Sequence, residues 1–435
     1  MYKYVYGSDN MNLKYNIGEK PPKMEMFISG IQWLAITLPI ILIIGNVIAN
    51  IFPNINAVIY IQSLFIMVGI AILLQITFGH GLPSIIGPAT VLLIAVIATL
   101  NQGMGSINSS LIIGGVILAI VAFSGGMKYV EKLFSSKVII VILALIVFTL
   151  IPSILDLTII NNGVLSSINF IFVLVSLFVI LIAHKFFKGL WKSAIPLGIM
   201  IFGSIFYFLL LNPKIMGNFN VSTIAAPNIQ MNLAVPDLGI VLAFLICFLA
   251  LAINDVGSIQ AIGAIVKLDK MEKRIKKGLG ITGIMNVFSG IIGVIGPVNY
   301  SMTPGIIAAT KNASKYPLYI TGIALIIIAF SPFLVAVISA VPRPIIAVVL
   351  IYIMTAQIGA AIMLAKENNS FKSMDDGIIV GLPIIIGTMI AFLPNTVTTE
   401  LPLLVRPLLG NAFVMGLVIA LFLEHIIFKK KRNNT

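Results

Sequence analysis

The chain has 435 residues, of which 59% are hydrophobic and only 9% are charged, and its mean hydropathy is +1.12. This composition excludes a water-soluble globular protein, in which about a quarter of the residues are charged. The formal net charge is +13, but the basic residues lie in short segments between long apolar runs, so a nucleic-acid-binding surface is also excluded. The composition therefore predicts an all-α polytopic membrane protein.

The chain begins with a polar tail, residues 1–25, and continues with a long uncharged region. No Asp, Glu, Lys or Arg occurs from Met26 to Met127, which leaves room for four membrane spans of about 20 residues each. No small-residue cleavage pattern follows the first apolar run. We therefore expect this run to be a retained span rather than a signal peptide.

Two apolar segments are interrupted by Pro and Gly. The third predicted span begins GLPSIIGPAT at Gly81, and residues 296–305 read GPVNYSMTPG within a stretch that has no charge between Lys277 and Lys311. Backbone groups freed by such a break are tolerated at membrane depth only where they are buried in protein or line a cavity. The segments begin at positions 81 and 296, which are 215 residues apart, and transporters build central sites from such paired broken helices.

Counting spans between the basic loops gives about fourteen, seven in each half of the chain. Because seven is odd, the second half must enter the membrane upside down relative to the first, which predicts 7+7 inverted repeats with broken third and tenth spans. The alternative is that the two Gly/Pro segments are ordinary loops with short re-entrant turns. The predicted spans lie near residues 26–50, 57–77, 82–100, 109–126, 137–155, 167–184, 191–211, 237–265, 279–296, 300–311, 316–339, 341–364, 376–395 and 402–427.

The basic residues predict the orientation in the membrane. Of the 27 Lys and Arg, 24 lie in the two tails and in alternate loops, and only Lys214, Arg343 and Arg406 lie in the opposite set. The positive-inside rule then places both termini in the cytoplasm. We expect a multi-pass protein of the cell (plasma) membrane, whose partners include the lipid bilayer and no nucleic acid.

Asp255 is the acidic residue that lies deepest in an apolar run. It precedes Lys267 by 12 residues, which is about 18 Å of helix and places it near the middle of the bilayer. A carboxylate at that depth costs about 2.5–3.5 kcal/mol on insertion scales and marks a functional site by default. We expect Asp255 to exchange a proton or balance charge during transport. The alternative is a structural Asp that pairs with a hydroxyl or a helix N-terminus.

Other polar residues at span depth are weaker candidates. Asn254 and Ser258 are spaced i, i+4 and share one helical face, so they could bind a planar ligand together, or instead join two helices. Gln75 favours a contact between helices, whereas Gln32 fits such a contact and a ligand contact about equally. His80 stands between two glycines, which favours an interfacial turn over a proton carrier.

No pattern in the sequence indicates an enzyme. The three His and the single Cys are scattered, and neither a phosphate-binding Gly-Lys-Ser/Thr loop nor a nucleophile elbow occurs. We therefore expect no catalytic residues, no metal site and no cofactor.

The run from Met302 to Lys315 resembles the signature of the nucleobase–ascorbate transporters, also called the nucleobase:cation symporter-2 or xanthine/uracil permease family. The signature positions that match are Gly305, Thr310, Lys311, Ala313 and Ser314. Shorter matches, in the order that the family has them, are Gly30–Trp33, Gly69–Gln75, Leu82–Pro83 with Gly87, and Pro342–Pro344.

The chain departs from this family at the expected ligand contacts. The Glu that usually lies three residues before Gly257 is Asn254, and the His or Asp that often follows that glycine is Ser258. In the tenth span the signature Glu or Gln is Met302 and the signature Asn is Thr303, while the aromatic of the third span corresponds to Thr90. Tyr300 does match an aromatic of uracil-type members.

The resemblance implies a secondary active transporter (symporter) of a nucleobase such as uracil, xanthine or another purine, driven by H⁺ or Na⁺. It implies a core domain of residues 26–127 and 237–340 (spans 1–4 and 8–11), a gate domain of residues 128–236 and 341–427 (spans 5–7 and 12–14), and cytoplasmic tails at 1–25 and 428–435. Asp255 is the implied coupling residue. The implied substrate site consists of Gln32, Thr90, Asn254, Asp255, Gly257, Ser258, Tyr300, Ser301, Met302, Thr303 and Gly305, beside the signature residues Thr310 and Lys311.

Three alternatives remain open. An anion transporter or exchanger of the sulfate or bicarbonate type shares the 7+7 architecture, and two facing helix N-termini suit an anion. A channel is a second alternative. A non-transporting scaffold is the third, but it leaves the two matched helix breaks without a purpose. The sequence also leaves open which base is carried, which cation drives transport and whether the protein forms a homodimer.

Overall fold

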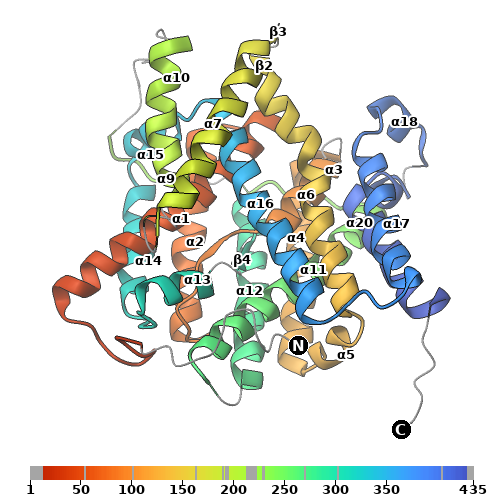
Figure 1. The fold of residues 1–435 in the computed structure, drawn as a ribbon, viewed down its shortest axis with the longest axis horizontal. Helices are drawn as coiled ribbons and strands as arrows, with labels where there is room; N and C mark the ends of the chain where they lie inside the picture. Colours follow the sequence, from red (N-terminus) through yellow and green to blue (C-terminus); the bar gives the residue numbers. More distant parts are fainter. Residues whose placement is uncertain are drawn as a thin grey trace.

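The computed structural model describes residues 13–52, 55–99, 102–161, 164–188, 191, 195–211, 223–227, 231–268, 271–300, 303–402 and 405–428, and it is mostly helical (Figure 1). The helices are α1 (Lys23–Ile51), α2 (Ala57–Thr77), α3 (Thr90–Ala98), α4 (Gly103–Ser124), α5 (Met127–Glu131), α6 (Ser136–Ile159), α7 (Ser167–Phe186), α9 (Ile195–Gly198), α10 (Ser204–Leu211), α11 (Leu238–Ile265), α12 (Met271–Ile292), α13 (Thr303–Thr310), α14 (Pro317–Ala329), α15 (Pro332–Ser339), α16 (Arg343–Glu367), α17 (Met374–Ala391), α18 (Asn395–Glu400), α19 (Arg406–Leu409) and α20 (Ala412–Phe422). Two π-helical turns, η2 (Ile199–Gly203) and η4 (Leu423–Ile427), and four short strands, β1 (Ile86–Pro88), β2 (Ile160–Asn161), β3 (Val164–Leu165) and β4 (Pro297–Asn299), complete the fold.

Eight of the described helices are long and apolar enough to cross a membrane: α1, α2, α4, α6, α7, α11, α16 and α17. The pair α14 and α15 would add a ninth, although its two helices meet at 100°. Pro332 begins α15 there, and the Ser331 side chain caps it by accepting a hydrogen bond from the Leu334 N–H. These helices confirm a polytopic membrane protein, whereas the count of fourteen spans stays a prediction.

Helices of the predicted core domain cross at glycines. α2 packs on α14, and α4 packs on α12. A Cβ atom on Gly69 would lie 2.7 Å from the carbonyl oxygen of Gly322, and one on Gly115 would lie 2.8 Å from that of Gly283. A carbon and an oxygen that are not bonded cannot approach so closely, so these crossings require glycine. In a bilayer such small residues matter because close packing, rather than the hydrophobic effect, holds helices together.

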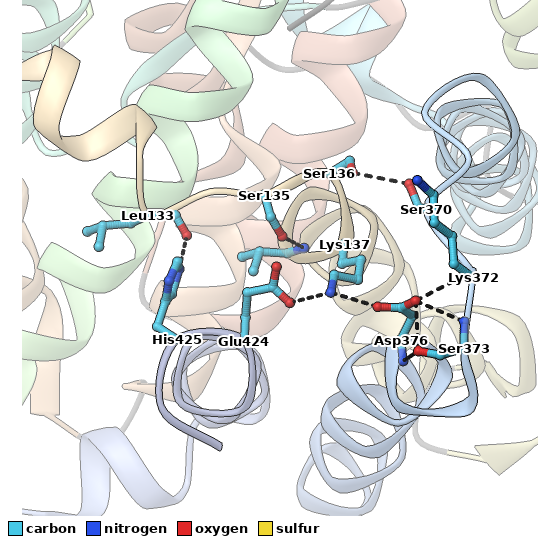
Figure 2. Close-up of polar contacts among 11 residues, drawn as sticks. Leu133, Ser135, Ser136, Lys137, Ser370, Lys372, Ser373, Asp376, Glu424 and His425 are labelled. Carbon is cyan, nitrogen blue, oxygen red and sulfur yellow. Dashed lines mark hydrogen bonds and ion pairs between the residues drawn. The ribbon is translucent and has the colours of Figure 1, made fainter. Parts of the chain in front are cut away.

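Three charged side chains join the helices of the predicted gate domain, where α6 packs against α16, α17 and α20 (Figure 2). Lys137 in α6 lies 3.0 Å from a carboxylate oxygen of Asp376 in α17 and 2.7 Å from one of Glu424 in η4. We call these three residues the charged triad. Asp376 also accepts the backbone N–H of Ser373 and so forms a capping box at the start of α17. The triad therefore ties three separate elements together at one end of the gate.

Basic segments that are distant in the sequence come together at one end of the molecule. Lys128 in α5 pairs with Glu272 in the first turn of α12 at 2.6 Å. The N-terminal segment runs beside the loop after α13, where the backbone N–H of Lys14 donates to the carbonyl of Lys311. In Figure 1, α5 lies at the bottom, while β2, β3, α10 and α18 lie at the top. This arrangement agrees with the alternation of basic loops, and which end faces the cytoplasm stays a prediction.

Candidate functional site

The two Gly/Pro segments singled out in the sequence lie side by side. β1 pairs with β4 in antiparallel register, with Ile86 opposite Asn299 and Pro88 opposite Pro297. Each strand leads into a short helix, β1 into α3 and β4 into α13. Proline lacks an N–H group and interrupts a helix, so the extended backbone on either side needs other partners. Here the two extended segments supply them to each other.

The middle of α11 packs on β4 and contacts its backbone. Ser258 Oγ donates to the Asn299 carbonyl oxygen at 2.9 Å, and Asn254 Nδ2 lies 3.5 Å from the same oxygen, at the outer limit of a hydrogen bond. The two side chains thus share one face of the helix, as their spacing predicts. In this structure the face is directed at the strand backbone.

Asp255 is fully buried, and its carboxylate accepts three hydrogen bonds. Thr282 Oγ1 donates to Oδ2 at 2.7 Å, while the backbone N and the side-chain Nδ2 of Asn299 donate to Oδ1 at 2.8 and 2.6 Å. The Thr282 hydroxyl is a partner of the kind that the structural alternative expects, whereas the backbone N–H belongs to strand β4 rather than to a helix N-terminus. The carboxylate therefore fixes β4 to α11 and α12, and its role in coupling stays a proposal.

A hydrogen-bond network extends from Asp255 to the turn after α2. His80 Nδ1 accepts the Leu82 N–H at 2.9 Å, so the proton of the neutral ring is on Nε2, which lies 3.0 Å from Asn299 Oδ1. On the other side, Gln75 Nε2 donates to Thr282 Oγ1 at 3.0 Å and so joins α2 to α12, as expected for this residue. His80 does lie in a turn, but it is buried rather than interfacial. No local pattern connects the two sides of this network, because His80 and Asn299 are 219 positions apart and Gln75 and Thr282 are 207 positions apart.

A small cavity of about 50 Å³ lies between the core and gate elements. Thr90, Asn254 and Tyr300 line it from α3, α11 and the end of β4, and Ile146 and Gln357 line it from α6 and α16. Typical ligand pockets measure about 300–1,000 Å³, so the gate helices must move away before a ring-shaped ligand fits. Gln357 was not predicted, although a single amide in the apolar span at 341–364 could have indicated it.

Three further predicted site residues, Thr303, Gly257 and Gln32, do not line this cavity. Thr303 is buried and links the two breaks, because its Oγ1 donates to the Tyr300 carbonyl and accepts the Ile85 N–H. Gly257 is buried within α11, and Gln32 is half-buried in α1. Neither of these two lines the cavity.

The signature residues end a helix. Thr310 is the last residue of α13, and its Oγ1 donates back to the Ile306 carbonyl. Lys311 is exposed and adopts a left-handed conformation, with φ of 55°. Gly305 lies in the first turns of α13. Ser301 and Met302 lie outside the described residues.

No group of three or more His, Cys, Asp or Glu side chains in the described ranges is arranged to hold a metal ion. The polar side chains that line the cavity carry hydroxyl or amide groups: Thr90, Asn254, Tyr300 and Gln357. Such groups can donate and accept hydrogen bonds at the edge of an uncharged polar ring.

The overall fold resembles two solved transport proteins. The transmembrane domain of a cyanobacterium bicarbonate transporter, BicA, superposes with a TM-score of 0.61 at 17% identity, over 85% of this chain and 96% of that one. The murine Solute Carrier 26 family member A9 anion transporter, in an inward-facing state, superposes with a TM-score of 0.58 at 14% identity, over 93% of this chain and 69% of that one. At such low identities the likeness concerns the fold alone.

Sequence comparisons identify the family. A Clostridium perfringens (strain 13 / Type A) protein named "Putative purine permease" is 24% identical over 332 residues, which are 75% of this chain and 72% of that protein. The family model for xanthine/uracil permeases, described as "Permease family", matches residues 24–396. The resemblance noted in the signature run is thereby confirmed over most of the chain. The chain is a divergent member of the xanthine/uracil permease family.

Proposed function

We propose that this permease is a secondary active symporter that carries a nucleobase, such as uracil, xanthine or another purine, with H⁺ or Na⁺. The observation that carries the proposal is the cavity where uncharged polar groups of the core face one amide of the gate, Gln357. A planar base presents donors and acceptors along its edges, and amide and hydroxyl groups match them without a charged clamp. The family and the named relative support a base as the cargo.

In the proposed complex the base lies between α3, α11 and the end of β4. Asn254 and Thr90 offer hydrogen bonds from the core, and Tyr300 offers the side of its ring, because its hydroxyl already donates to the Pro88 carbonyl at 2.6 Å. Gln357, which lies in α16, hydrogen-bonds to the opposite edge of the base. The proposed site also includes the backbone near Gly305, where the first turn of α13 leaves N–H groups without intrahelical partners.

The anion alternative has weaker support. The two solved neighbours transport anions, but they show a shared fold alone. No Lys or Arg lines the cavity in the described part of the chain, whereas specific recognition of an anion usually employs such a charge-assisted partner. The first turns of α3 and α13, which leave backbone N–H groups without intrahelical partners, favour an anion.

We further propose the 7+7 inverted organisation and the division into core and gate. In seven-span repeats, span 2 corresponds to span 9 and span 4 corresponds to span 11. The crossing of spans 2 and 11, helices α2 and α14, then corresponds to the crossing of spans 9 and 4, helices α12 and α4. Both of these crossings require glycine, Gly69 on Gly322 and Gly283 on Gly115. The same relation pairs β1 with β4. This internal correspondence supports two inverted repeats that meet at the site.

The purified protein in proteoliposomes tests the function. Uptake of labelled uracil, xanthine, hypoxanthine, guanine and adenine is compared with uptake of sulfate and bicarbonate, under imposed H⁺ or Na⁺ gradients. We expect one or a few bases to accumulate with one of the two gradients and to raise the melting temperature. Transport of inorganic anions alone would replace the proposal with the anion exchanger.

Site-specific labelling tests the proposed orientation. A cysteine in place of the exposed Lys372 should react with an impermeant reagent only after cells are permeabilised. A cysteine in place of the exposed Asp156, near the opposite end of α6, should react in intact cells. The reverse pattern would invert the topology and place the basic loops outside.

A further inference from the structure

A second cavity, of about 1190 Å³, is separate from the proposed transport site. It is bordered by the end of α2, the end of α11, the first turns of α12 and two loops, at residues 16–18 and at Lys315. All of these belong to the predicted core domain or the N-terminal tail, and no lining residue is shared with the cavity at Gln357. We call it the basic pocket. The basic pocket is therefore distinct from the small cavity between core and gate.

The lining of the basic pocket is strongly cationic. It includes Lys273, Arg274, Lys276, Lys277 and Lys315, against a single carboxylate, that of Glu272. That carboxylate is already 2.6 Å from the ammonium of Lys128. The positive-inside rule accounts for cations at this end of the molecule, but it does not require five of them around one cavity.

Most of this charge has no carboxylate partner among the described residues. Lys273, Lys276 and Lys277 are exposed, and none of them ion-pairs with a carboxylate in the described ranges. Lys315 Nζ donates to the Ile76 carbonyl at 3.3 Å, and Arg274 Nη1 donates to the His80 carbonyl at 2.6 Å. Both use neutral oxygens, so their positive charges also remain uncompensated. A concave site with several such cations attracts anions and raises their local concentration.

The floor of the basic pocket is connected to the core of the protein. Arg274 holds the turn formed by Gly79, His80 and Gly81, and the positive φ of 66° at Gly81 lets the backbone approach the guanidinium. The His80 ring reaches Asn299, which in turn holds Asp255. An anion that engages Arg274 therefore contacts the segment that leads into β1.

We propose that the basic pocket binds a phosphate-bearing anion of about nucleotide size. Guanidinium groups bind phosphate oxygens in bidentate fashion, and lysines add point charges around them. The volume exceeds what inorganic phosphate alone fills, since pockets of about 300–1,000 Å³ accommodate drug-sized ligands. The phosphate belongs either to a soluble nucleotide or to the headgroup of an anionic lipid, and the chemistry of recognition is the same.

Binding of AMP to the purified full-length protein in phosphatidylcholine nanodiscs tests the proposal, with inorganic phosphate and adenosine as comparison ligands. We expect AMP to bind and to raise the melting temperature, phosphate to bind more weakly, and adenosine to bind at least tenfold more weakly than AMP. The double variant K273A/K277A should weaken AMP binding at least tenfold. The matched control K366A/K372A removes the same charge at the same end of the molecule but outside the pocket, and it should stay within twofold of the wild type.

The lipid source is separated in nanodiscs that contain phosphatidylglycerol. Undiminished AMP binding there assigns the site to a soluble nucleotide. Loss of AMP binding in these discs, together with a lower melting temperature of K273A/K277A in phosphatidylglycerol alone, assigns it to the lipid headgroup. Equal binding of AMP and adenosine, equal weakening in both double variants, or no binding of AMP or phosphate in phosphatidylcholine would overturn the proposal.

Discussion

The predicted core and gate domains accommodate polar side chains in different ways. In the core, 67% of the most apolar stretch of α11 is buried, compared with 28% for α17 and 17% for α7 in the gate; α6 of the gate, at 61%, is nevertheless more buried than α4 of the core, at 44%. Asp255, Asn299 and His80 lie buried in the enclosed region, whereas the charged triad of the gate lies at the ends of its helices. Polar groups at membrane depth need protein around them, which the packing around α11 supplies to Asp255, whereas the charged triad lies at helix ends.

This difference bears on how the protein would move. The β1–β4 pair, the contacts of Asp255 and the glycine crossings hold the core elements to one another. The gate touches the cavity through Ile146 and Gln357 alone. Sliding of the gate against the core would enlarge the cavity while the core hydrogen bonds stay intact. Four comparisons of variants test the contrast, from the largest expected effect to the smallest.

Asp255→Asn in the core should abolish coupling. We expect the variant to reach the membrane but to lose gradient-driven accumulation of the base by at least about tenfold, because an amide cannot exchange a proton at membrane depth. One amide oxygen also cannot accept all three hydrogen bonds, which should lower the free energy of unfolding by about 1–3 kcal/mol. Uptake into energised vesicles measures the first effect, and Asp156→Asn on the exposed end of α6 is the control. Full accumulation would leave Asp255 with a structural role only.

Lys137→Gln in the gate should destabilise the protein more than any single surface change. The substitution leaves Asp376 and Glu424 close together without their cation, and removal of one partner from a buried ion pair costs about 3–5 kcal/mol. Thermal unfolding in detergent measures the change. The matched variant Lys132→Gln removes an exposed lysine just before α6 and should unfold like the wild type. Equal melting temperatures for the two variants would show that the triad does not hold the gate together.

Gly283→Ala and Gly359→Ala compare a tight helix crossing of the core with an open position on a gate helix. A Cβ on Gly283 would lie 2.6 Å from the backbone nitrogen of Ala119, whereas one on Gly359 in α16 meets nothing within 4 Å. We expect the first to lower the free energy of unfolding by about 1–3 kcal/mol and the second to change it by less than about 0.5 kcal/mol. Denaturation of the purified variants provides the measurement. An unchanged free energy of unfolding in Gly283→Ala would contradict the close packing of the core helices.

Gln357→Ala should weaken binding of the transported base without changing stability. Loss of one neutral hydrogen bond is worth about 0.5–1.5 kcal/mol, or roughly a two- to tenfold rise in Kd. The control is Thr355→Ala, an exposed position on the same helix. Calorimetric titration measures the Kd of both variants for the base that the uptake panel identifies. An unchanged Kd for Gln357→Ala would remove Gln357 from the proposed site.

The amino-acid sequence by itself determined the class of the protein and the segments that matter. Apolar runs without charges can only be membrane spans in a chain of this composition. The clustered prolines and glycines at 81–90 and 296–305 indicate helix breaks, because proline lacks the N–H that the ladder needs and glycine weakens a helix; single prolines, by contrast, lie within α1, α6 and α17. The order of the motifs also sufficed to indicate the xanthine/uracil permease family.

Only the tertiary structure decided which residues meet. Most of these helices are apolar on every side, so no periodicity tells which face looks inward. Asn299 reaches Asp255 because β4 packs on α11, and His80 reaches Asn299 because the segment before β1 lies beside β4, more than 200 residues away in the sequence. Gln357 likewise faces the cavity because α16 packs on α6. Contacts between distant segments depend on how whole helices pack, and that information is not contained in any local run of residues.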